Sequence, residues 1–116
     1  MKKTSIKPCI VGLGYVGLPL FLKLQNKMCT IGYDNDNIRI RDLKIGLDIN
    51  KEFTKKDLIL NKKSYFSSKL KDLKKGNFYI VAVPTPINNN FKPNLNYLKQ
   101  CCILLGKSLK KKDIVF

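Results

Sequence analysis

Gly12-Leu-Gly-Tyr-Val-Gly17 is the most informative segment of this 116-residue chain, and it holds three of the chain's seven glycines. A short apolar run, Ile6 to Val11, precedes it and is typical of a buried strand. From Tyr15 to Met28, apolar residues recur at the spacing of one helix face. The stretch therefore predicts a tight turn that leads from a buried strand into a helix.

The spacing GxGxxG, placed between a strand and a helix, indicates a dinucleotide-binding turn. Gly12 allows the tight turn, Gly14 lets the backbone approach a pyrophosphate, and Gly17 permits close packing of the helix on the strand. Free N–H groups near Tyr15 and Val16 lie at the positive end of the helix, where they can receive phosphate charge. The alternative is a structural glycine turn that binds no ligand. The predicted cofactor-binding residues of this turn are Gly12, Leu13, Gly14, Tyr15, Val16 and Gly17.

An acidic residue ends the second predicted strand, Cys29 to Tyr33. Asp34 follows Gly12 by 22 residues, close to the ~20 expected for the acid that binds the adenosine ribose. A carboxylate pairs with a free 2′-hydroxyl and repels a 2′-phosphate, so Asp34 favours NAD over NADP. Arg39, five residues further on, is predicted to lie along the adenosine. The alternatives are a helix cap for Asp34 and a solvated surface charge for Arg39.

The rest of the chain alternates between predicted strands and helices. Strands are expected at 65–67, 78–83 and 113–116, and helices at 37–43, 54–60, 68–75 and 95–109. Thr54 and Ser68 are expected to cap the middle two helices, and Asn94 the last. The inward face of the last helix is expected to carry Leu95, Leu98, Cys102, Leu105 and Leu109. The pattern predicts an α/β fold, a doubly wound parallel (Rossmann) sheet that ends within or just after its fifth strand.

The composition excludes several classes of function. The formal net charge is +15, but Arg39 and Arg41 are the only arginines among 23 basic residues. Base-edge recognition favours Arg, so the lysines favour a solvated surface and no nucleic-acid partner. There is no His, and Glu52 is the one Glu, so we expect no metal site and no self-contained hydrolase.

The cysteines and the apolar N-terminal run bear on localisation. The four cysteines form no CxxC motif, and we expect small buried residues of a reduced cytoplasmic protein. The uncharged run 8–22 is too short to span a bilayer as a helix. We therefore expect no membrane partner.

Three stretches resemble one known family. They are Val-Gly-Leu-Gly-Tyr-Val-Gly-Leu-Pro-Leu at 11–20, Gly-Tyr-Asp at 32–34 with Arg39, and Phe-Tyr-Ile-Val-Ala-Val-Pro-Thr-Pro-Ile at 78–87. Together they are similar to the N-terminal NAD-binding segment of the UDP-glucose/GDP-mannose dehydrogenase family, over essentially all 116 residues. Val-Pro-Thr-Pro-Ile-Asn and the stretch 47–50 look most like the UDP-N-acetylglucosamine/galactosamine 6-dehydrogenases of surface-polysaccharide synthesis, such as the Vi-antigen enzyme.

The resemblance implies a cofactor, a substrate and a missing catalytic part. The cofactor is NAD, and Pro84 and Thr85 line the nicotinamide side of its cleft; the alternative is prolines that merely end a strand. The full-length family enzyme acts on a nucleotide sugar and works as a homodimer or with a complementing chain. Its cysteine nucleophile lies beyond residue 116, so no catalytic residue is assigned.

The resemblance also implies a domain organisation. Residues 1–116 are expected to form an incomplete NAD-binding Rossmann domain, a fragment or truncated reading frame without the family's central and UDP-binding domains. The alternative is a stand-alone NAD-sensing domain that regulates a transporter.

Overall fold

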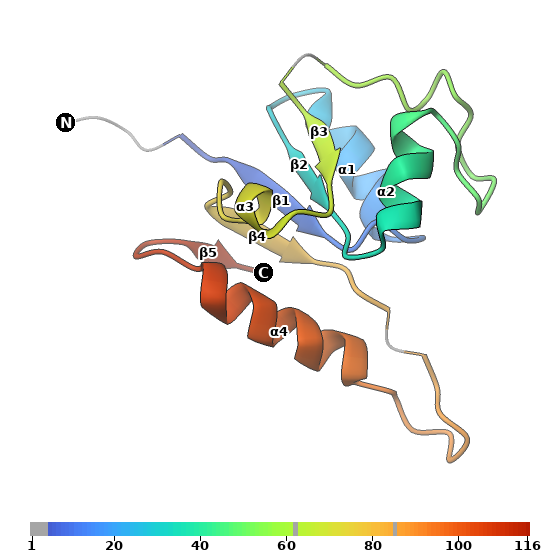
Figure 1. Cartoon of the computed structure of the whole chain (residues 1–116), viewed down its shortest axis with the longest axis vertical. Coiled ribbons are helices and arrows are strands. Elements are labelled where there is room, and N and C mark those ends of the chain that lie inside the picture. The colour runs from blue at the N-terminus through green and yellow to red at the C-terminus, as the bar shows by residue number, and fades with distance from the viewer. Residues whose placement is uncertain (1–4, 62, 85) are drawn as a thin grey trace.

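Strands and helices alternate along the chain as predicted (Figure 1). The computed structural model describes residues 5–61, 63–84 and 86–116. In chain order its elements are β1 (Pro8–Val11), α1 (Gly17–Gln25), β2 (Ile31–Tyr33), α2 (Asn37–Lys44), β3 (Tyr65–Ser67), α3 (Leu70–Leu73), β4 (Phe78–Val81), α4 (Asn96–Ser108) and β5 (Ile114–Val115).

The strands form one parallel sheet in the order β3-β2-β1-β4-β5. In its register, Cys9 of β1 lies opposite Ile31 on one side and Tyr79 on the other. The chain runs outward from β1 through β2 to β3 and then returns to β4 on the other side of β1. This confirms the doubly wound sheet, and it places the topological switch point at the carboxyl ends of β1 and β4.

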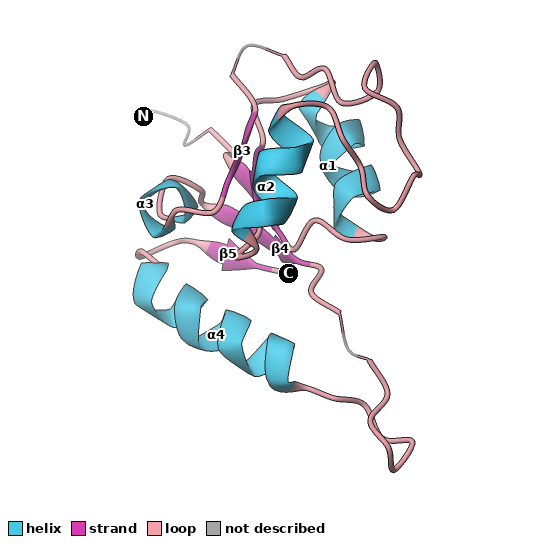
Figure 2. Cartoon of the chain, turned by 45° about the vertical axis from the view of Figure 1, so that its right-hand side comes forward, coloured by secondary structure: helices cyan, strands magenta, loops and turns pink. Residues whose placement is uncertain are grey.

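Helices cover both faces of the sheet, so the molecule has three layers (Figure 2). Successive side chains of a strand point to opposite faces, and β1 supplies both cores. Ile10 packs with the α1 and α2 side, whose buried members are Leu13, Leu18, Phe21, Leu22, Ile40, Leu43, Leu58 and Phe66. Cys9 and Val11 pack with the α3 and α4 side, whose buried members are Ile31, Tyr33, Leu73, Tyr79, Cys101 and Leu105.

The predicted helix at 54–60 is wrong, because the chain makes only a hydrogen-bonded turn at 55–58. Thr54 does cap this turn, and its hydroxyl oxygen accepts the N–H of Asp57 at 3.3 Å. Beyond it, the N–H of Asn61 donates to the Gln25 side chain at the end of α1, 2.9 Å away, and the Asn61 amide donates to the Gln25 carbonyl. These tertiary bonds hold the chain in an extended path toward β3.

The caps and faces of two later helices also differ from the prediction. In α3 the cap position is Lys69, whose N–H donates to the hydroxyl of Ser67 at 3.0 Å, so Ser68 is not the cap. In α4 the buried residues are Cys101, Leu105 and Ser108, whereas Leu95, Cys102 and Leu109 of the predicted inward face are exposed.

A polar residue explains the error in α4. The hydroxyl of Ser108 donates to the Leu104 carbonyl at 3.0 Å, so this side chain is satisfied within the helix and can be buried. The predicted cap of α4 is also wrong, because the cap position is Leu95, which makes no side-chain cap hydrogen bond. Asn94 lies one residue earlier, and its side chain accepts the N–H of Asn96 at 3.0 Å.

Candidate functional site

A cavity of about 590 Å³ opens at the carboxyl ends of the central strands, where a doubly wound sheet binds its ligand. Its lining residues are Val11, Gly12, Leu13, Gly14, Tyr33, Asp34, Asn35, Asp36, Arg39, Ile49, Asn50, Val83, Pro84, Tyr97, Gln100, Cys101 and Leu104. The structure thus brings the first half of the glycine turn, Gly12 to Gly14, together with Asp34, Arg39 and Pro84 around one space. The predicted site residues Tyr15, Val16 and Gly17 are not among its lining residues. The predicted site residue Thr85 lies outside the described residues.

The three glycines of the turn differ in what surrounds them. Gly12 has φ +100°, and a Cβ there would lie 2.8 Å from the carbonyl oxygen of Ala82, the residue that follows β4. A Cβ on Gly17 would overlap the carbonyl oxygen of Gly12. Gly14 has no heavy atom within 4 Å of its would-be Cβ among the described residues. The first and third glycines are therefore required by the fold, and the second faces open space.

Backbone donors are free at the start of α1. The N–H groups of Gly14, Tyr15 and Val16 have no acceptor in the described part of the chain. Tyr15 and Val16 are also the exposed residues of the turn, at 67% and 71%. Unpaired N–H groups at the positive end of a helix attract anions.

Asp34 joins the end of β2 to the glycine turn. Its Oδ2 accepts the N–H of Leu13 at 3.0 Å, and its Oδ1 accepts the N–H of Asp36 at 2.9 Å. The cap of α2 is Asp36, whose side chain accepts the N–H groups of Ile38 and Arg39. The alternative in which Asp34 caps this helix is therefore wrong, and its half-buried carboxylate lines the cavity.

Arg39 is buried against the glycine turn. Its Nε and Nη2 donate to the Leu13 carbonyl at 2.9 and 2.7 Å, and its Nη1 donates to Asp48 Oδ1 at 2.7 Å. Only 8% of Arg39 is exposed, so the alternative of a solvated surface charge is wrong.

Asp48 is the buried acid that the sequence analysis missed. It accepts the N–H groups of Asn50, Glu52 and Phe53 at 3.0–3.2 Å. Burial by itself would raise the pKa of Asp48, but the hydrogen bonds from Arg39 and from the backbone leave that pKa below its usual value. A usable signal was present, since Asp48 stands between Leu47 and Ile49 and an Asp-x-Asn pattern favours a local turn.

The two buried thiols, of which only Cys101 lines the cavity, are not activated. Burial, with a smaller contribution from Cys101, raises the pKa of Cys9 to about 12. Burial, with a contribution from Cys102, raises the pKa of Cys101 to about 11. Both thiols are neutral near pH 7 and are poor nucleophiles. Cys29 and Cys102 are exposed, so the expectation that all four cysteines are buried is wrong for these two.

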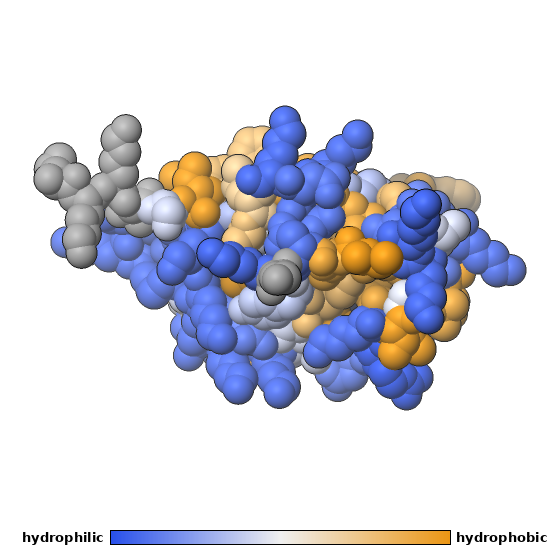
Figure 3. Space-filling model, turned by 90° about the horizontal axis from the view of Figure 1, so that it is seen from above, coloured by the Kyte–Doolittle hydropathy of each residue, from blue (hydrophilic) through white to orange (hydrophobic). Residues whose placement is uncertain are grey.

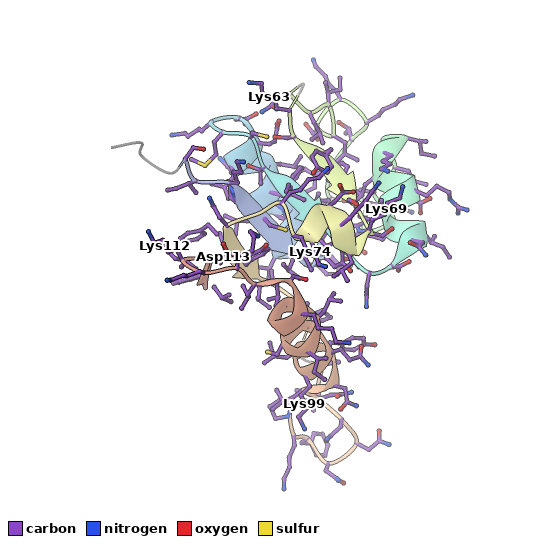
Figure 4. All side chains as sticks on the ribbon, turned by 60° about the vertical axis from the view of Figure 1, so that its left-hand side comes forward. Lys63, Lys69, Lys74, Lys99, Lys112 and Asp113 are labelled. Atoms are coloured by element: carbon purple, nitrogen blue, oxygen red, sulfur yellow. The ribbon has the colours of Figure 1, made fainter. Side chains whose placement is uncertain are left out.

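The basic side chains are spread over the surface. Figure 4 shows Lys63, Lys69, Lys74, Lys99 and Lys112 at separate places along the chain. Figure 3 shows hydrophilic side chains interspersed with apolar patches on the face it views. Within the described ranges, no three or more acidic, Cys or His side chains gather as a metal site, and no helix is long and apolar enough to cross a bilayer.

Comparison with known proteins places these observations in a family. The model of the UDP-glucose/GDP-mannose dehydrogenase family, NAD binding domain, matches residues 6–116. A UDP-N-acetyl-D-glucosamine 6-dehydrogenase of Salmonella typhi is 40% identical over 111 residues, which are 96% of this chain and 26% of that protein. Protein CapL of Staphylococcus aureus is 42% identical over 106 residues, which are 91% of this chain and 25% of CapL.

Solved structures agree on the fold. The UDP-D-ManNAc dehydrogenase of Pyrococcus horikoshii matches with a TM-score of 0.83 at 25% identity, over 95% of this chain and 27% of that one. The GDP-mannose dehydrogenase of Pseudomonas aeruginosa matches with a TM-score of 0.79 at 22% identity, over 90% of this chain and 26% of that one. The chain spans about a quarter of the length of the curated relatives that it matches. It belongs to the UDP-glucose/GDP-mannose dehydrogenase family, of which it represents the NAD-binding domain.

Proposed function

We propose that residues 1–116 are an incomplete NAD-binding Rossmann domain and supply the cofactor half of a cytoplasmic nucleotide-sugar 6-dehydrogenase. The substrate class is a UDP-N-acetylhexosamine, oxidised to its uronate for surface-polysaccharide synthesis. The likeness to UDP-N-acetyl-D-glucosamine 6-dehydrogenases at about 40% identity supports this choice over a transporter-regulating domain. The cavity at the switch point of the sheet carries the proposal.

The residues around the cavity fit NAD. The space in front of Gly14 is open, and this is where a pyrophosphate needs to approach the backbone. The unpaired N–H groups at 14–16 suit its negative charge. The carboxylate of Asp34 stands at the end of β2, where the adenosine ribose of a Rossmann ligand lies.

We propose that each chemical group of NAD has a matching part of the cavity. The turn Gly12–Gly17 holds the pyrophosphate, Asp34 accepts the ribose hydroxyls, and Arg39 closes the adenosine side. Pro84, which follows β4 and lines the cavity, lies on the nicotinamide side. Bound NAD supplies the acceptor for a hydride; the chain's own part is to bind and orient it.

Titration calorimetry with NAD and NADP tests the binding role. We expect weak binding of NAD and weaker binding of NADP, because Asp34 repels a 2′-phosphate. Asp34→Ala should raise the Kd for NAD by roughly tenfold, the size of one lost charge-assisted hydrogen bond. The same variant should bring the Kd values for NAD and NADP closer together. Tight binding of NADP with none of NAD would overturn the role given to Asp34.

A second prediction concerns turnover. Oxidation of an alcohol to a carboxylate needs a base and, in a thiol-based route, an activated thiolate. Cys101, which lines the cavity, and the buried Cys9 both have raised pKa values and are neutral near pH 7. The purified chain should form no NADH from UDP-glucose, UDP-N-acetylglucosamine or UDP-N-acetylgalactosamine, as followed by absorbance at the NADH band. Sustained NADH formation that is lost on mutating Cys101 or Cys102 would contradict this expectation.

A further inference from the structure

We propose that Asp48 is a specificity-determining positioning residue of the cofactor site. By holding the guanidinium of Arg39 against the glycine turn, Asp48 keeps that positive charge from engaging a 2′-phosphate. The preference for NAD would then rest on two carboxylates, one at the ribose and one behind the arginine. This inference rests on the proposed function, that the cavity takes NAD.

Three observations show how firmly Arg39 is held. Two of its nitrogens share the carbonyl of Leu13, and the third contacts Asp48 at 2.7 Å. The side chains of Arg39 and Asp48 are only 9% and 1% exposed. A planar guanidinium fork bonded on two sides has little freedom to turn toward another anion.

The position of this pair makes it relevant to the cofactor. Asp34 accepts the N–H of Leu13, and Arg39 donates to the carbonyl of the same residue. Leu13 therefore has a carboxylate on one side and a guanidinium on the other, at the wall of the cavity. In related folds an arginine near this point accommodates the 2′-phosphate of NADP. A cation so placed needs a competing anion if NAD is to be preferred.

Asp48 supplies that anion and also shapes the adjoining wall. Its carboxylate accepts the N–H groups of Asn50, Glu52 and Phe53, which folds residues 48–53 into a compact turn. Ile49 and Asn50 of this turn line the cavity next to Arg39. The turn follows α2 in the chain and lies on the same side of the sheet as α1 (Figure 1).

The test compares nucleotide selectivity in the 116-residue chain. Calorimetry, with competition where binding is weak, gives the ratio of the NADP Kd to the NAD Kd. Asp48→Asn keeps the size of the side chain but removes its charge, and we expect this ratio to fall by about tenfold, the worth of one ion pair to a 2′-phosphate. The double variant Asp48→Asn with Arg39→Gln should return the ratio to the parent value, because the released cation is gone.

Asp57→Asn is the matched control. Asp57 lies in the neighbouring exposed turn, bonded to Thr54, and its substitution changes the net charge by the same amount. It should leave the ratio within about twofold of the parent, a change of less than 0.5 kcal/mol. Circular dichroism and thermal melting establish that each variant is folded.

Arg39→Lys keeps the test decisive if Asp48→Asn does not fold. Lysine retains the charge but cannot bridge the Leu13 carbonyl and Asp48 as a fork does, so the ratio should again fall. If Asp48 were only structural, Asp48→Asn would raise the Kd values for NAD and NADP by the same factor and leave their ratio unchanged. That result would overturn the inference. A parent chain that binds neither nucleotide would instead overturn the proposed function.

Discussion

At the scale of single residues, the glycine turn separates the requirements of the fold from those of the ligand. Gly12 and Gly17 have backbone atoms where a side chain would have to go, so the strand-to-helix turn cannot form without them. Gly14 has free space there, and nothing in the described structure needs a glycine at this position. The glycine at position 14 therefore meets a requirement of the bound ligand and not of the fold.

Replacing Gly14 by Val should therefore abolish NAD binding and leave the fold intact. We expect a change of less than about 1 kcal/mol in the free energy of unfolding, as for a substitution that meets no neighbour. Gly17→Ala is the contrast, and it should cost about 3 kcal/mol or more, because its Cβ would overlap the Gly12 carbonyl. Urea unfolding and NAD calorimetry measure the two effects. Unchanged NAD affinity in Gly14→Val would mean that the turn is structural only.

At the scale of secondary-structure elements, α4 forms one wall of the cavity and packs on the sheet through a narrow stripe. Cys101 and Leu105 face the core beneath it, while Tyr97 and Gln100 line the cavity. Gly106 lies on the exposed side of α4, with no heavy atom of the described residues within 4 Å of a would-be Cβ. Gly106 therefore weakens the helix with no compensating contact.

Gly106→Ala should stabilise the protein. Alanine favours a helix interior over glycine by about 1 kcal/mol, and the exposed position adds no clash. Gly46→Ala serves as the matched control, because Gly46 has φ +85° and its Cβ would overlap the Lys55 side chain, so the same substitution should destabilise there. Urea denaturation curves give both values. A loss of stability in Gly106→Ala would show that α4 is not helical at this position in solution.

At the scale of the whole molecule, the two cores differ in chemistry. The core under α1 and α2 is purely aliphatic and aromatic, whereas the core under α3 and α4 contains two thiols and two phenols. Burial, followed by the charges of Asp113 and Cys9, raises the pKa of Tyr79 to about 12. The Tyr79 hydroxyl donates within the core, with the carbonyls of Leu73 and Gly76 2.7 and 2.9 Å away.

This second core should make the protein sensitive to alkali. The pKa of the Cys9 thiol is about 12 in the folded protein, against 9.0 for an unperturbed thiol. Between these two values the unfolded chain loses this proton while the folded chain keeps it, so the stabilisation from the neutral thiol is complete below pH 9 and is lost as the pH rises toward 12. Each such thiol should lower the free energy of unfolding by up to about 1.4 kcal/mol per pH unit in this range. Urea unfolding at several values above pH 8 measures the slope. Cys9→Ala should make the slope of the unfolding free energy against pH less steep. An equal slope in that variant would mean that groups other than Cys9 cause the loss of stability at high pH.

Local sequence patterns were enough to predict the order of the strands and helices, the strand-to-helix turn and the place of Asp34 at the end of β2. These depend on local spacing and on the conformational freedom of glycine, which a sequence displays directly. Three features became clear only from the folded chain: Arg39 is buried against Asp48, Cys101 rather than Cys102 faces the core, and residues 54–60 do not form a helix. In each case the outcome depends on partners that local spacing does not reveal: a carbonyl 26 residues earlier, a serine satisfied within its own helix, and an asparagine bonded 36 residues back to α1.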